Sequence, residues 1–66
     1  MIATITGFGN LGASVIIIEA DKADGKPVTL YAEARAYESL EVGGEYDFDI
    51  EAGLVISAEL LVAPGL

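Results

Sequence analysis

Hydrophobic and polar residues alternate along this chain in short runs that predict β-strands. The alternation is clearest from Glu45 to Ile50, where Tyr46, Phe48 and Ile50 fall on one face and acidic residues on the other. The segment after Gly12 holds four consecutive β-branched residues, which pack well on a pleated sheet. We expect five strands, at residues 2–6, 14–20, 28–32, 45–50 and 54–62. In the last of them, one face is predicted to carry Ile56, Ala58, Leu60 and Val62.

Turn residues separate these runs. Asp24-Gly25 is a strong turn signal, and Pro27 suits the first position of a strand because it cannot donate to a ladder. Residues 33–40 (EARAYESL) are good helix formers with Ala36 and Leu40 four apart, so we expect one or two helical turns there.

Three strands, a short helical link and two further strands form the element order of an OB-fold, a small five-stranded Greek-key barrel. The alternative is an SH3-like barrel, which differs mainly in lacking a real helix between strands three and four. The 66 residues are expected to form one domain, residues 1–66.

The stretch IATITGFGNLG contains Gly7-x-Gly9-x-x-Gly12, which resembles a dinucleotide-binding fingerprint. A nucleotide site of that kind needs a helix after the glycines, whose free N–H groups hold the phosphates. The residues that follow predict a strand. We therefore interpret the motif as a hairpin turn that carries Phe8 and Leu11 on its loop, and we expect no cofactor.

The amino-acid composition excludes several kinds of catalytic and metal site. The chain has no histidine and no cysteine, which excludes the usual zinc ligands and the Ser-His and Cys-His nucleophilic systems, so we expect no enzyme and no metal site. Eleven acidic residues against three basic ones give a net charge of −8. So small a core makes a homodimer plausible, and no run resembles a membrane span or a signal peptide, so we expect a soluble, cytoplasmic protein.

Two stretches carry a family resemblance: DGKPVTLYAEARAYESLEVGGEYDFDIEAG and the closing GLVISAELLVAPG. They resemble the minimal OB domains of single-stranded-DNA-binding proteins, including those of filamentous phages. The resemblance implies a non-catalytic module that stacks bases on aromatic side chains and holds phosphates with cations. Carried over by position, it nominates Phe8, Lys22, Lys26, Tyr31 and Arg35. The charge departs from that family, because only three cations oppose eleven acids.

The acidic face of the fourth predicted strand supports a second hypothesis. Glu45, Asp47, Asp49 and Glu51 would follow one another at about 6.7 Å along an exposed face. Such a row can simply keep a strand soluble and prevent edge-to-edge pairing, or reflect adaptation to high salt. It can also bind a basic protein, as an interaction or assembly module that mimics a row of phosphates.

Overall fold

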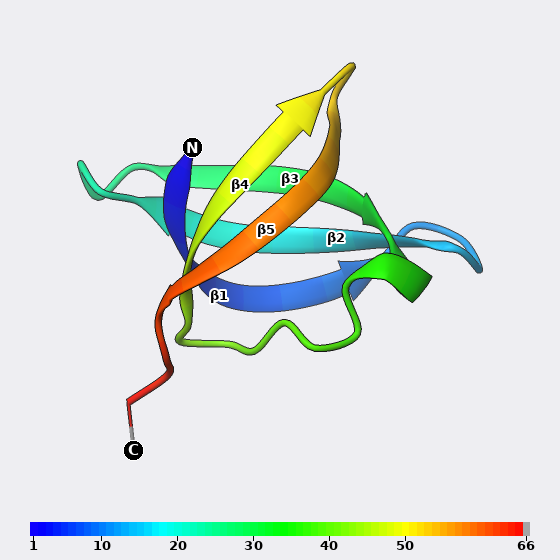
Figure 1. Ribbon diagram of the computed structural model, residues 1–66. Helices are drawn as coiled ribbons and strands as arrows, with labels where there is room; N and C mark the ends of the chain where they lie inside the picture. The colour runs from blue at the N-terminus through cyan, green and yellow to red at the C-terminus, as the bar shows by residue number, and fades with distance from the viewer. Residues whose placement is uncertain (66) are drawn as a thin grey trace.

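The computed structural model describes residues 1–65, apart from the side chain of Ala36, and folds them into one five-stranded antiparallel sheet (Figure 1). Its elements are β1 (Ile2–Asn10), β2 (Val15–Lys22), β3 (Pro27–Glu33), the short 3-10 helix η1 (Ala34–Ala36), β4 (Glu45–Glu51) and β5 (Leu54–Val62). The strands lie in the order β3-β2-β1-β4-β5. The small all-β class and the five strands are therefore as predicted.

The sheet curves so that β4 and β5 cross over β2 and β3 (Figure 1). Strand β5 also approaches β3, although no hydrogen-bonded ladder joins these two strands within residues 1–65. The core lies inside this curve and is formed by alternate residues of all five strands. Its buried members are Ala3, Ile5, Ile18, Ala20, Leu30, Ala32, Tyr46, Phe48 and Val55.

Strand β1 connects the two halves of the sheet. Most of its length pairs with β2, whereas only Ile2, Ala3 and Thr4 pair with β4. Two backbone hydrogen bonds extend this junction, from the Ile5 N–H to the Gly44 carbonyl at 3.0 Å and from the Gly43 N–H to the Ile5 carbonyl at 2.8 Å. We call this short β1–β4 ladder and its two flanking bonds the seam.

Strand β4 follows its predicted alternation over most of its length. Tyr46 and Phe48 are buried, with ring centroids 5.7 Å apart, and the acidic residues face outward. Ile50 lies on the predicted face, opposite the buried Val55, but 39% of its surface is exposed. It lies beyond the residues that pair with β1, where β4 and β5 project from the sheet as a hairpin (Figure 1).

The predicted helical link over residues 33–40 is confirmed only in part, since it is reduced to the three residues of η1. Tertiary contacts fix both ends of this turn. The Ala34 N–H donates to the Ser14 carbonyl at 2.9 Å, and the Tyr37 hydroxyl donates to the Val55 carbonyl at 3.1 Å. The chain then reaches the seam through two turns and not a regular helix, with hydrogen bonds from the Leu40 N–H to the Tyr37 carbonyl at 3.2 Å and from the Gly44 N–H to the Glu41 carbonyl at 3.1 Å.

The β2–β3 turn follows the sequence prediction closely. Gly25 has a φ of +84°, and the Asp24 carboxylate accepts a hydrogen bond from the Lys26 N–H at 3.0 Å. Pro27 is the first residue of β3, as expected. Within the described residues no helix has the length and apolarity needed to cross a membrane.

The β4–β5 turn places an alanine in an unfavourable backbone conformation. Ala52 has a φ of +53° and Gly53 a φ of +82°, so both central residues of the two-residue turn are left-handed. Hairpin turns of this kind strongly prefer Asn-Gly, because an L-residue with a Cβ is strained there and asparagine tolerates the conformation best.

We therefore predict that Ala52→Asn stabilises the protein by about 1 kcal/mol, measured by urea unfolding. The control is Ala23→Asn, in the β2–β3 turn, where the alanine is exposed and has no positive φ. Equal effects of the two substitutions, or destabilisation by Ala52→Asn, would contradict the strain at Ala52.

Candidate functional site

Tyr31 lies on the outer face of β3 with 38% of its surface exposed. Its cross-strand neighbour is Ile17, and the next position across the sheet is Gly9 of β1. Val28, Leu30 and Ala32 occupy the opposite, inward face, as the alternation of this strand predicts. Together Tyr31, Ile17 and Gly9 form a small apolar shelf on the outer face, which we call the Tyr31 shelf.

Phe8 lies on the other face of the sheet, and the prediction that it sits on a loop is wrong. Strand β1 continues through Gly7 and Gly9 to Asn10, so of the three motif glycines only Gly12 lies in the turn, with a φ of +80°. A bulge at Thr6 shifts the alternation by one residue, and Phe8 therefore pairs with the buried Ile18.

This placement puts Phe8 at the rim of a shallow hollow of about 390 Å³ at the open end of the sheet. Ile16, Tyr37 and Leu40 form the rest of its apolar lining. Phe8 and Tyr31 therefore cannot stack on one nucleic-acid strand along a single face, because they point to opposite sides of the sheet.

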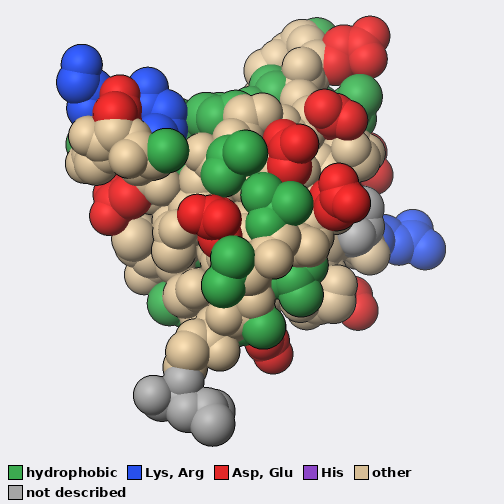
Figure 2. Space-filling model, turned by 60° about the vertical axis from the view of Figure 1, so that its left-hand side comes forward, with side chains coloured by type: hydrophobic (Ala, Val, Ile, Leu, Met, Phe, Trp, Pro, Cys, Tyr) green, Lys and Arg blue, Asp and Glu red, His purple; other side chains and the backbone are tan. Residues whose placement is uncertain are grey.

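The three basic side chains are divided between two places. Lys22 ends β2 and Lys26 lies in the turn that follows, whereas Arg35 is in η1 beyond the other end of β3. Tyr31 is four residues along β3 from Pro27, which is about 13 Å. Lys22 and Lys26 therefore lie near the end of β3 opposite to Arg35, and away from Tyr31. On the face in Figure 2, basic side chains lie at two opposite margins.

Acidic side chains gather on the outer face of β4 and β5. The predicted row of Glu45, Asp47, Asp49 and Glu51 faces outward, and Glu59 of β5 is the cross-strand partner of Asp47. We call these five residues the acidic surface. Glu59 was not singled out from the sequence, because only the β4–β5 register brings it opposite Asp47. Figure 2 shows acidic and hydrophobic side chains interspersed over the middle of one face.

The acidic surface continues across the seam. Thr4 of β1 pairs with Glu45 on one side and with Asp21 of β2 on the other, so it stands between two carboxylates. The β4–β5 hairpin contains no lysine or arginine. Like charges directly opposite each other in a ladder are destabilising, and the cation that lies beside Asp47 of this surface is the N-terminal ammonium of Met1, from outside the hairpin.

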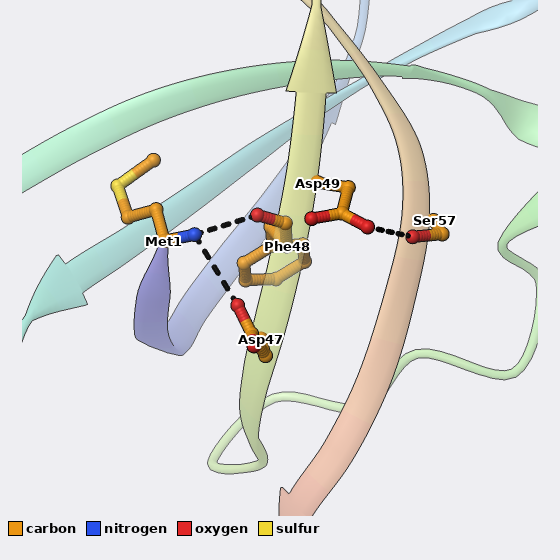
Figure 3. A network of polar contacts seen from close by, with 5 residues as sticks. All are labelled: Met1, Asp47, Phe48, Asp49 and Ser57. Atoms are coloured by element: carbon orange, nitrogen blue, oxygen red, sulfur yellow. Dashed lines mark hydrogen bonds and ion pairs between the residues drawn. The ribbon is translucent and has the colours of Figure 1, made fainter.

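Two carboxylates of this surface do have partners (Figure 3). The N-terminal ammonium of Met1 lies 3.3 Å from Asp47 and donates to the Phe48 carbonyl at 2.7 Å. The Ser57 hydroxyl donates to Asp49 at 2.9 Å. The carboxylates are exposed or half-buried, so they remain accessible to a ligand from solvent.

Strand β5 is unusually apolar for so exposed an element. Five of its nine residues are large hydrophobic side chains with at least 42% of their surface exposed: Leu54, Ile56, Leu60, Leu61 and Val62. The predicted single face of Ile56, Ala58, Leu60 and Val62 is wrong, because the β4–β5 register skips Ile56 and Leu61. Two bulges therefore break the alternation of β5.

Within residues 1–65, no three carboxylates converge as a metal ion requires. Comparisons of the chain with protein-family models, with curated protein sequences and with solved structures find no match. Inference about function therefore depends on the side chains of this fold alone.

We predict that Glu59→Gln stabilises the protein by roughly 0.2–1 kcal/mol at low salt, because it removes the charge opposite Asp47. The gain should shrink in 1 M salt, where the screening length is about 3 Å. Glu51→Gln is the control, since its cross-strand partner is Leu54. Equal gains from both substitutions would show that the pairing with Asp47 is not the cause.

The Tyr37 hydroxyl joins the segment before β4 to the backbone of β5 by a hydrogen bond, and the surroundings of this hydroxyl shift its pKa. Partial burial, and secondarily the carboxylate of Glu33, raise the pKa of Tyr37 above its ordinary value of 10.0. The folded state thus holds the phenolic proton more tightly than the unfolded state. This contribution is fully present below pH 10 and is lost as the pH rises through the raised pKa.

We accordingly predict that Tyr37→Phe shows a shallower loss of stability above pH 10 than the parent protein. At neutral pH it should be less stable by about 0.5–1.5 kcal/mol, because the hydrogen bond to Val55 is lost. Urea unfolding at a series of pH values measures both effects. Identical alkaline profiles would contradict the assignment to Tyr37.

Proposed function

We propose that this protein is a non-catalytic interaction module that binds a positively charged protein partner through the acidic surface. The observation that carries the proposal is the gathering of five carboxylates on a hairpin without a basic residue, in which Glu59 faces Asp47 and the Met1 ammonium, 3.3 Å from Asp47, offsets part of the charge. A bound cationic side chain would relieve this repulsion, so the charge pattern favours a basic ligand. The exposed apolar residues of β5 would add contact area beside the charges.

We further infer that the sheet is an OB-like Greek-key barrel. Two observations support this. The fourth strand returns to lie beside the first, which is the strand order of a Greek key, and β5 approaches β3 as a partly closed barrel requires. Because such folds carry many unrelated functions, the choice of ligand is argued from the side chains.

A second candidate is binding of single-stranded nucleic acid, and the Tyr31 shelf favours it. An exposed tyrosine beside a glycine and an isoleucine offers a base a flat surface for stacking. Electrostatics count against it, because Lys22 and Lys26 lie at the far end of the hairpin and Glu19 and Glu33 share the outer face of the shelf. We therefore place it second.

The test is fluorescence anisotropy with a labelled peptide of alternating lysine and valine. We predict binding that weakens with salt and falls at least tenfold in the variant Asp47→Asn, Asp49→Asn, Glu59→Gln. A tenfold loss is about 1.4 kcal/mol, which is within reach of three partly exposed charges. The matched control, Asp24→Asn, Glu38→Gln, Glu41→Gln, removes the same charge elsewhere and should retain most of the affinity.

Equal losses in the two variants would mean that net charge alone attracts the peptide, and would contradict a defined acidic surface. A labelled single-stranded DNA of mixed sequence tests the second candidate in the same assay. Salt-sensitive DNA binding that is lost on Tyr31→Ala would favour the nucleic-acid function instead.

A further inference from the structure

Strand β5 ends the sheet and leaves one side of its backbone without a partner strand. It pairs with β4 on one side, and within residues 1–65 no ladder forms on its other side (Figure 1). An unpaired edge exposes a row of backbone donors and acceptors that can accept another chain.

The inward face near this edge is also uncovered. Ala58 and Leu60 pair with Phe48 and Tyr46, whose side chains are buried, so both lie on the core side of the sheet. Leu60 is nevertheless 52% exposed, in contrast to 5% for Tyr46. A residue on the core side of a strand becomes exposed in this way when the neighbouring strand that would cover it is missing.

The accessible part of the edge can be delimited. The beginning of β5 is already occupied: the Tyr37 hydroxyl donates to the Val55 carbonyl, and Glu33, at the end of β3, lines a hollow together with Leu54, Val55 and Ile56. Bulges at Ile56 and Leu61 interrupt the ladder on either side of a regular stretch from Ser57 to Leu60. We call residues 57–60 the edge window.

We propose that an extended, positively charged segment of a partner protein pairs with the edge window as a sixth strand. Its apolar residues would cover Leu60 and Ala58 on the inward face. Its lysine or arginine residues would lie on the outward face beside Glu59 and the rest of the acidic surface. The proposal rests on the proposed function and specifies how the basic partner binds.

Charge decides between this occupant and a second copy of the chain. Glu59 lies in the edge window, and antiparallel pairing of two such windows would bring two Glu59 side chains together beside two acidic surfaces. Each copy also carries a net charge of −8. A cationic segment meets the same carboxylates with attraction, so the edge discriminates against self-pairing.

The experiment uses the alternating lysine–valine peptide in two further forms, N-methylated at every valine or at every lysine. In an extended strand, successive N–H groups point to opposite sides, so only one of the two sets faces β5. We expect one form to bind at least tenfold more weakly than the unmodified peptide and the other to bind within about threefold of it. Slower hydrogen exchange at amides of residues 57–60 should accompany binding.

Equal affinities of the two methylated forms would overturn strand addition, whether both are strong or both are weak. If the two methylated forms bind equally but the variant Asp47→Asn, Asp49→Asn, Glu59→Gln still loses affinity for the unmodified peptide, the proposed function stands and strand addition is rejected. If the unmodified peptide does not bind at all, both proposals fail.

Discussion

The seam between β1 and β4 is the contact on which the rest of the structure depends. Only Ile2, Ala3 and Thr4 pair with β4, and the two bonds between Ile5 and Gly43–Gly44 extend this contact. A two-stranded hairpin such as β4–β5 is at best marginally stable alone, so it needs the seam to join the sheet. The seam also brings Tyr46 and Phe48 over the core residues of β1 and β2.

The acidic surface follows from the register of this seam. Because side chains alternate along a strand, burying Tyr46 and Phe48 turns Asp47 and Asp49 outward. A slip of one residue would bury the carboxylates and expose the aromatic rings, which the core does not allow. The gathering of carboxylates on the outer face is therefore a consequence of burying the aromatic rings, and the Met1 ammonium offsets part of this charge at Asp47.

The sequence predicted correctly those parts of the fold that depend on residues close together in the chain, such as strand alternation and turns. The alternation of β4, the Asp24-Gly25 turn and the position of Pro27 are of this kind, and the structure confirms them. The helical link over residues 33–40 is shorter than its propensity predicts, because hydrogen bonds of Ala34 and Tyr37 to other parts of the fold fix this segment and a series of turns leads from it to the seam.

The site was less predictable, since it depends on bulges and on cross-strand register. The bulge at Thr6 moves Phe8 to the inward face, and those at Ile56 and Leu61 rearrange β5. Glu59 has an ordinary position in the sequence and joins the acidic surface only because the β4–β5 register places it opposite Asp47. No pattern within a single strand indicates such a pairing.

The most direct test of the central claim is a chemical-shift map of the isotope-labelled protein titrated with the lysine–valine peptide. The account predicts that the largest changes fall on the backbone amides of β4 and β5, and that the amides around Tyr31 and Phe8 change little. Changes centred on the Tyr31 shelf or on the hollow beside Phe8 would contradict it.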